Sequence, residues 1–418
     1  MAAASGFRNV LRALRHPNYG IYTAGSSVSL IGTWMQRIAV GWLAWELTGS
    51  GAWLGAVAFA DLFPTVLIGP LAGAAADRWN RLRVIKVSQC LACCQSVTLF
   101  VLTATGAMTI ELLLLLTLAL GVIIAFNQPA RLALIPNLVP REDLPAAVAI
   151  NSVIFNSARF LGPAVAGLLI VSVGVAAAFA ANALTFTVFL FALSRIRLQA
   201  PASPPSDRDR PLFGDIAEGL RYVAGHPGIA PLLLMMVIVS TCARPFVELL
   251  PGFADRVFGS GADGLAIMTS TVGLGAVAGG LWLAQRAGAQ GLTRLVLASG
   301  LVLGLALLGF VATRALWLAV PALALAGFVM VVGGVGTQTL LQLSLEPDIR
   351  GRVMSLYGLI FRGAPAVGAL AMGGASDFVG LRLPLAVGAG LTLLACALIW
   401  TRRRHLAAAL EREPVPAA

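Results

Sequence analysis

The chain has 418 residues, of which 58% are hydrophobic and 11% are charged. An ordinary soluble domain carries roughly 25% charged residues, so this composition excludes a soluble globular protein and indicates an integral membrane protein. The formal net charge of +11 does not indicate nucleic-acid binding, because the arginines lie in short clusters between apolar runs and no aromatic-rich basic surface accompanies them.

An amphipathic segment comes first in the chain. Within residues 1–18, apolar side chains alternate with arginines at helical spacing, a pattern suited to the anionic face of a membrane. The apolar run that follows is longer than the core of a cleavable signal, which has about 7 to 15 residues. We therefore expect residues 1–18 to remain as a cytoplasmic N-terminal anchor.

Turn signals divide the rest of the chain into twelve apolar segments long enough to cross a bilayer. The loops between them alternate in arginine content: DRWNRLR, VPRED and TRRRH belong to one set, and ELTGSG, ATGAMT and GSGADG to the other. Because arginine-rich loops stay in the cytoplasm, the sequence predicts a multi-pass protein of the inner (plasma) membrane with both termini cytoplasmic. The predicted crossings are residues 19–45, 52–76, 84–105, 109–131, 144–173, 175–194, 229–257, 263–285, 292–312, 315–343, 352–375 and 382–400.

One long polar segment separates the crossings into two groups of six. Residues 195–228 are rich in proline, serine and arginine, which is typical of a linker, and their apolar side chains recur at the spacing of a short surface helix. The sequence thus predicts an N-terminal six-helix bundle over 19–194, a C-terminal one over 229–400 and a cytoplasmic tail over 401–418. The stretches FNQPARLALIPNLVPREDL and GTQTLLQLSLEPDIRGR share one pattern, as expected of a parallel repeat.

The loop after the second predicted crossing carries a compact charge cluster. In GPLAGAAADRWNRLRVI, Gly73, Asp77, Arg78 and Arg81 resemble the signature loop between helices two and three of the major facilitator superfamily. The resemblance implies that the aspartate and its arginines latch the cytoplasmic side shut. A charge pair with little access to water can bias a two-state equilibrium in this way; the alternative is that the arginines set topology alone, which needs no acid.

Longer stretches extend the resemblance over essentially the whole chain. NYGIYTAGSSVSLIGTWMQRIAVGWLAWELTGSG and EPDIRGRVMSLYGLIFRGAPAVG resemble the branch of the superfamily that contains the enterobactin exporter and macrolide efflux proteins. This likeness implies the all-α major facilitator fold, with twelve transmembrane helices in two six-helix bundles. Gly162, Pro163 and Gly167 also resemble the Gly-Pro element of antiporters.

Polar side chains recur on one face of several predicted crossings. Ser29, Thr33 and Gln36 share a face of the first crossing, and Asn156 lies on such a face of the fifth. Lipid penalises such a stripe and a water-filled cavity accepts it, so we expect these residues to line the substrate cavity, as the corresponding helices do in the family that the chain resembles. Four arginines accompany the stripes and favour neutral or anionic cargo over cationic cargo: Arg37, Arg159, Arg244 and Arg362.

Two acids, Asp61 and Glu248, lie well inside predicted crossings. Asp61 and Arg37 fall at the same depth of two antiparallel crossings, and Arg244 precedes Glu248 by one helical turn, so each acid has an arginine within pairing reach. A carboxylate opposed by an arginine in a partly dry cavity can load and release a proton. The sequence therefore predicts proton coupling at Asp61 or Glu248, with purely structural ion pairs as the alternative.

These features favour a secondary active transporter, most simply a monomeric proton-coupled exporter of a small amphipathic, drug-like or siderophore-like molecule. ATP-driven transport within the chain is excluded, because its single lysine, Lys86, follows isoleucine and not the glycine of a P-loop. A membrane-embedded enzyme is the competing class, but no cofactor motif, metal-ligand cluster or nucleophile constellation reaches the membrane interior. An uptake or lipid-flipping permease of the same fold stays open, as do the cargo and the direction of transport.

Overall fold

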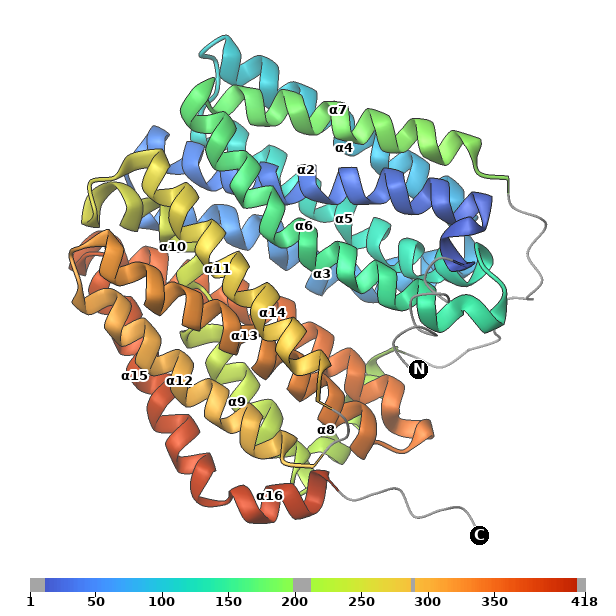
Figure 1. The fold of residues 1–418 in the computed structure, drawn as a ribbon, viewed down its shortest axis with the longest axis vertical. Helices are drawn as coiled ribbons and strands as arrows, with labels where there is room; N and C mark the ends of the chain where they lie inside the picture. Colours follow the sequence, from blue (N-terminus) through green and yellow to red (C-terminus); the bar gives the residue numbers. More distant parts are fainter. Residues whose placement is uncertain (1–11, 198–211, 287–289, 412–418) are drawn as a thin grey trace. The chain divides into compact units, whose positions relative to one another are not determined.

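The computed structural model describes residues 12–197, 212–286 and 290–411, and every regular element in these ranges is helical. The anchor before Arg12 and the linker residues 198–211 lie outside the described residues. The first helices are α2 (Pro17–Thr48), α3 (Gly51–Arg78), α4 (Arg81–Ala104), α5 (Ile110–Leu134), α6 (Leu144–Ser172) and α7 (Val175–Arg195) (Figure 1). Two short 3-10 helices, Ile135–Asn137 and Arg141–Asp143, connect α5 and α6.

The second part of the chain is equally helical (Figure 1). It contains α8 (Leu212–Gly225), α9 (Ile229–Cys242), α10 (Phe246–Gly252), the π-helix η3 (Phe253–Val257), α11 (Gly261–Ala284), α12 (Leu292–Ala312), α13 (Leu316–Ser344), α14 (Pro347–Val379), α15 (Arg382–Thr401) and α16 (Arg403–Leu410).

Eleven helical spans in the described residues are long and apolar enough to cross a membrane. They confirm the helical membrane fold that the sequence predicts. The first predicted crossing is not among the eleven, although α2 has 32 residues and about 20 suffice to span the hydrocarbon core. The reason is its polar content, since serine, threonine, glutamine and arginine side chains lower its mean hydropathy.

The chain forms two compact units. Among the described residues, unit 1 holds the chain up to Leu47 and again from Phe63 to residue 197, and unit 2 holds Thr48–Leu62 and everything from residue 212 onward. Helix α3 therefore begins in unit 2 and ends in unit 1.

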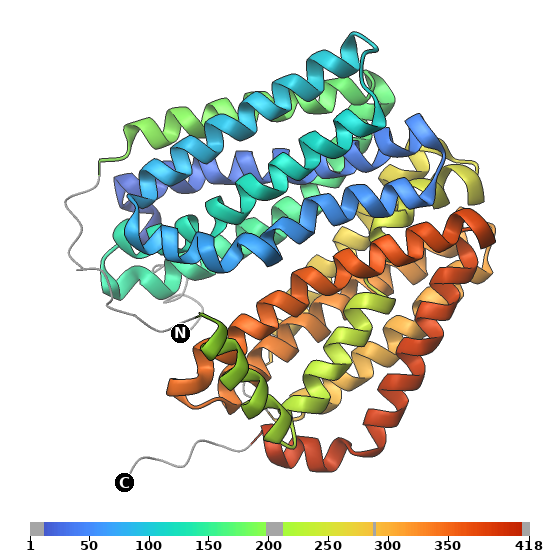
Figure 2. The same cartoon turned by 180° about the vertical axis from the view of Figure 1, so that it is seen from behind.

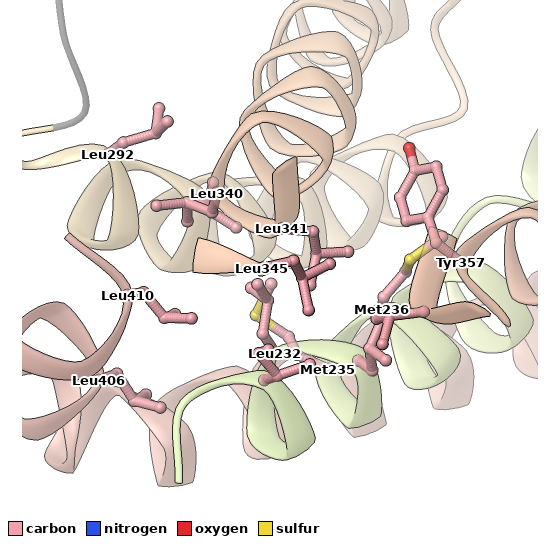
Figure 3. Packing of buried hydrophobic residues seen from close by; sticks show 14 of the residues in the cluster. Leu232, Met235, Met236, Leu292, Leu340, Leu341, Leu345, Tyr357, Leu406 and Leu410 are labelled. Atoms are coloured by element: carbon pink, nitrogen blue, oxygen red, sulfur yellow. The ribbon is translucent and has the colours of Figure 1, made fainter. Parts of the chain in front are cut away.

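The core of unit 2 gathers where α9, α12, α13, α14 and α16 meet (Figure 3). Leu232 and Met235 of α9 pack there with Leu341 of α13 and with Leu406 and Leu410 of α16. Helices α8 and α16 are short and lie across the same end of unit 2, beside the longer helices (Figures 1 and 2). Helix α8 occupies the part of the linker for which the sequence predicts a short helix.

The core of unit 1 is smaller and centres on two buried tyrosines. Tyr19 and Tyr22 of α2 pack with Leu134 of α5 and with Phe189 and Leu193 of α7. The Tyr19 hydroxyl donates a 2.8 Å hydrogen bond to a backbone carbonyl of α6, that of Ala147. The phenol is therefore satisfied although its ring is 1% exposed, as buried tyrosines require.

Candidate functional site

In unit 1, two of the predicted arginines lie beside one tryptophan. The guanidinium carbons of Arg37 on α2 and Arg159 on α6 lie 5.5 Å and 5.6 Å from the centroid of the Trp34 ring, within cation–π range. Phe155 meets the same indole edge-on, with ring centroids 5.9 Å apart. We call these four residues the unit 1 cluster.

The unit 1 cluster exists because α6 approaches α2 closely. A Cβ atom at Gly162 would lie 2.4 Å from the Cβ of Trp34 and 2.9 Å from the carbonyl oxygen of Ile31, so a larger residue would push the helices apart. Trp34 precedes Arg37 by three residues and Phe155 precedes Arg159 by four. That spacing places aromatic and arginine on one helix face, and it is the signal by which the aromatic partners could have been found from the sequence.

Unit 2 carries a counterpart. The guanidinium carbon of Arg244 lies 4.2 Å from the centroid of the Phe361 ring, and its Nη1 donates a 3.4 Å hydrogen bond to the Phe361 carbonyl oxygen. Tyr357 stacks on Phe361 with ring centroids 5.8 Å apart, and Arg362 is the next residue on α14. We call these four residues the unit 2 cluster. Each unit thus holds at least one arginine against an aromatic face within its predicted crossings.

Arg244 lies at a break in the helix that the sequence predicts as continuous over 229–257. The ends of this span are as predicted, but α9 ends at Cys242 and α10 begins at Phe246. The Arg244 amide donates to the carbonyl of Val239, five residues back, at 3.1 Å, and Pro245 has no amide hydrogen to continue the helix. Interrupted helices are tolerated in membranes where protein or a water-filled cavity surrounds them, and they often mark transporter binding sites.

The two predicted coupling acids lie on different helices, Glu248 on the short α10 and Asp61 on the long α3. Glu248 is half-buried in the first turn of α10, just after the break that contains Arg244, and the helix dipole favours a negative charge there. Asp61 is half-buried in the part of α3 that belongs to unit 2, whereas Arg37 belongs to unit 1. The pairing of Asp61 with Arg37 stays a prediction.

Two of the predicted cavity residues are buried between helices. Ser29 and Gln36 are each 1% exposed. The Gln36 amide donates to Gln95 at 3.0 Å, and its carbonyl oxygen accepts from Ser96 and Asn182, both at 2.7 Å. These partners lie on α4 and α7.

Ser29 is held in the same way, since its hydroxyl accepts a 3.1 Å hydrogen bond from Gln89 of α4. Both residues therefore join helices in this structure, which differs from the cavity-lining position expected for them. The physical reason is that a polar face within a membrane is satisfied equally well by polar side chains of a neighbouring helix. The other two candidates are more accessible: Thr33 is half-buried and Asn156 is exposed, and each donates to the carbonyl of the residue four positions earlier at 2.8 Å.

Replacement of Gln36 by leucine tests this assignment. The substitution strands the amide of Asn182, which is 0% exposed, so we expect a loss of about 1 to 2 kcal/mol in the free energy of unfolding. Thermal unfolding of the detergent-purified protein measures this loss, with the exposed Thr98→Val on α4 as control. A Gln36→Leu protein that melts with the parent but transports poorly would place Gln36 in the substrate path instead.

The latch loop is short. Gly73 lies within α3, Arg78 is exposed at its end, and Asn80 caps α4 by accepting a 3.0 Å hydrogen bond from the Arg83 amide. Arg81 is bound to the end of α5, where its Nη1 donates to the Ala133 carbonyl at 3.2 Å. The side chain of Asp77 lies outside the described part of the chain, so the latch stays a prediction.

Sequence analysis missed Arg131, the last residue of the fourth predicted crossing. On α5, its guanidinium donates to the hydroxyls of Ser26 and, at 3.4 Å, Tyr22, and lies 5.2 Å from the centroid of the Phe189 ring. It therefore ties α5 to α2 and α7. Because Arg131 lies at the edge of an apolar run, the sequence did not distinguish it from the arginines of a cytoplasmic loop.

Among the described residues, no group of three or more His, Cys, Asp or Glu side chains could hold a metal ion.

A helical membrane fold with arginines and acids inside its crossings is typical of a membrane transporter. Residues 9–415 match the family described as transmembrane secretion effector, a branch of the major facilitator superfamily. The chain belongs to this family, and the superfamily membership predicted from its motifs is confirmed.

Curated relatives are similar over most of their length. The staphyloferrin A transporter of Staphylococcus aureus is 22% identical, over 86% of this chain and 90% of the relative. Macrolide efflux protein A of Streptococcus pyogenes is 24% identical, over 86% and 89%. The enterobactin exporter EntS of Shigella boydii is 28% identical, over 86% and 85%.

Solved structures show the same fold. A bacterial homologue of the human lysosomal transporter Spinster, in an inward-facing and occupied conformation, gives a TM-score of 0.73 at 15% identity, over 96% of this chain and 98% of that one. A bacterial homologue of the iron transporter ferroportin, in an inward-facing state, gives 0.69 at 16% identity, over 92% and 98%. These structures share the fold of this chain, and the family match together with the curated relatives shows a transport protein of the major facilitator type.

Proposed function

We propose that this transporter is a proton-coupled exporter of a small amphipathic molecule, working by alternating access in the inner membrane with both termini cytoplasmic. The observation that carries the proposal is the pair of arginine–aromatic clusters, one in each unit. Aromatic faces bind the apolar, planar parts of a cargo, and guanidinium groups bind its acidic or polar parts. Relatives named as an enterobactin exporter and a macrolide efflux protein support the outward direction.

Proton coupling is proposed for Asp61 and Glu248. Both lie inside candidate membrane spans and both are half-buried, the position in which a change of access to water changes the affinity for a proton. Arg37, Arg159, Arg244 and Arg362 are the proposed charge partners. Thr33 and Asn156, which are more accessible than Ser29 and Gln36, are the proposed polar contacts to cargo.

The experiment is sided transport by purified protein in proteoliposomes with an imposed pH gradient. Radiolabelled macrolide and a siderophore probe are loaded on either face. Export predicts that the cargo moves from the face bearing the arginine-rich loops to the other face, in the direction opposite to proton flow. Uptake in the opposite sense would favour the permease reading, and cargo movement that ignores the gradient would favour a uniporter.

Trp34 gives the cluster a direct test. Trp34→Leu removes the indole that Arg37 and Arg159 both contact. We expect the apparent KM for an aromatic cargo to rise by up to about tenfold, since such contacts contribute about 1.4 kcal/mol or less. The control is Trp317→Leu, because Trp317 is 72% exposed on α13. Equal KM values for parent and Trp34→Leu would remove the unit 1 cluster from the cargo site.

A further inference from the structure

Asp377 lies in α14, beyond the end of the predicted crossing 352–375, and its carboxylate binds the start of α3. One oxygen accepts from the amides of Gly51 at 2.7 Å and Ala52 at 3.4 Å, and the other accepts from the Ser50 hydroxyl at 2.5 Å. The first amides of a helix have no partner within it, and an anion there is favoured by the helix dipole. Asp377 thus caps a helix far from it in sequence.

A second residue, Arg256 of η3, also binds the turn before α3. Gly49 ends α2 in the left-handed region, with φ +59°, and its carbonyl accepts a 2.8 Å hydrogen bond from Arg256 of η3. The backbones behind the cap also lie close together. A Cβ atom at Gly55 would lie 2.4 Å from the Ala369 carbonyl oxygen, and one at Gly373 would lie 2.2 Å from that of Gly51. The start of α3 is therefore fitted to α14 over its first two turns.

This contact has an unusual place in the chain. Residues 48–62 belong to unit 2, whereas α3 from Phe63 onward belongs to unit 1. Helix α3 thus contributes residues to both units, and the residues that bind its first turn and the preceding turn, Asp377 and Arg256, belong to unit 2. The Asp377 side chain is exposed, so water can replace it at the amides of Gly51 and Ala52, and the contact is reversible.

We propose that Asp377 is a positioning residue for alternating access: a releasable latch that holds the start of α3 on α14 and so stabilises the conformation closed at this end. This end is opposite the arginine-rich loops, on the extracellular side in the proposed topology. The inference rests on the proposed transport function. It adds to the predicted Asp77 latch a second one at the other end of α3. An exposed cap contributes about 1 kcal/mol or less, so its loss can shift the balance between two conformations without fixing either of them.

The chain offers a matched control for the cap chemistry. Glu411 accepts from the amides of Gly291 at 2.8 Å and Thr293 at 2.7 Å, and so caps α12 from outside. All of α12 and Glu411 belong to unit 2. Loss of that cap weakens a helix end without touching a helix shared by both units, so Glu411→Gln separates a general effect of capping from a latch.

The test measures conformation directly. In full-length protein with the native cysteines replaced by alanine, spin labels are placed at Ala107 of unit 1 and Arg314 of unit 2. Both are exposed and lie in turns that the proposed topology assigns to the extracellular side. In nanodiscs, we expect Asp377→Asn and Ser50→Ala to raise the ratio of long-distance (open) to short-distance (closed) conformations roughly fivefold, the size of a helix-dipole contact. Glu411→Gln should leave the ratio unchanged. Equal distance distributions in Asp377→Asn and the parent would overturn the proposal, and so would an equal shift in Glu411→Gln.

A second variant acts in the opposite direction. Because Ser50 and Asp377 touch, the pair Ser50→Cys and Asp377→Cys should form a disulfide that fixes the closed form and stops transport until a reductant is added. Oxidised protein that transports at the rate of the reduced protein would contradict the latch. Failure of the transport proposal looks different: no variant, the parent included, would move cargo, while the spin-label distances would still respond to Asp377→Asn.

Discussion

Replacement of Asp61 by asparagine, or of Glu248 by glutamine, is expected to lower transport driven by a pH gradient at least tenfold while leaving exchange of cargo intact. The two acids are half-buried within membrane spans, where a proton taken from one side can be released to the other only through a change in access. Acids in water-exposed turns keep their charge on either face of the cycle. The variants remove the titrating group and keep the shape of the side chain.

Counterflow separates this outcome from loss of structure. Exchange of labelled for unlabelled cargo needs no net proton movement, so a coupling variant should exchange at the rate of the parent. If the acids are structural ion pairs, loss of one partner leaves a buried charge uncompensated, and binding, exchange and stability should all fall together.

The matched control is Asp263→Asn, which neutralises an exposed acid in the first turn of α11 and should change neither assay. Should Asp61→Asn and Glu248→Gln both keep full pH-driven transport, proton coupling through these residues is refuted. A uniporter, or coupling to another ion, then becomes the better explanation.

The fold was predictable because long apolar runs end at recognisable residues. The predicted crossing 292–312 has the bounds of α12, and 175–194 differs from α7 by one residue, since glycine precedes each run. The break at Arg244 was not predicted, because Pro245 lies in a run whose overall hydropathy resembles that of a continuous helix. Helix α2 differs in another way: its 32 residues are long enough for a crossing, but its polar side chains lower its mean hydropathy below that of the other spans.

The candidate site was less predictable for a geometric reason. Periodicity identifies which residues share a face, but it does not identify what that face meets. Ser29 and Gln36 share a face with Thr33, and the sequence predicts that this face meets a water-filled cavity. In the structure, glutamines of α4 form hydrogen bonds with Ser29 and Gln36 instead. Trp34 and Phe361 were missed because an aromatic residue in a membrane helix can face lipid as readily as it can contact an arginine.

Replacement of Gly275 by alanine should destabilise unit 2 by about 3 kcal/mol, although alanine is ordinarily the better helix former. Helices α11 and α13 meet here through their backbones: a Cβ atom at Gly275 would lie 1.9 Å from the Ala324 carbonyl oxygen, and one at Gly327 would lie 2.0 Å from that of Val272. Neither obstacle is a flexible side chain, so the helices must separate and lose the packing on which helix association in membranes depends.

Gly309→Ala on α12 is the matched control, because a Cβ atom there meets nothing within 4 Å. That variant gains the intrinsic preference of alanine over glycine, about 0.5 to 1 kcal/mol, and should melt at or above the temperature of the parent. Thermal unfolding in detergent, followed by size-exclusion chromatography, compares the three proteins. The opposite order, with Gly275→Ala melting above the parent, would mean that α11 and α13 do not approach as closely as the structure has them, because the added methyl group would then cost nothing and only the helix preference would remain.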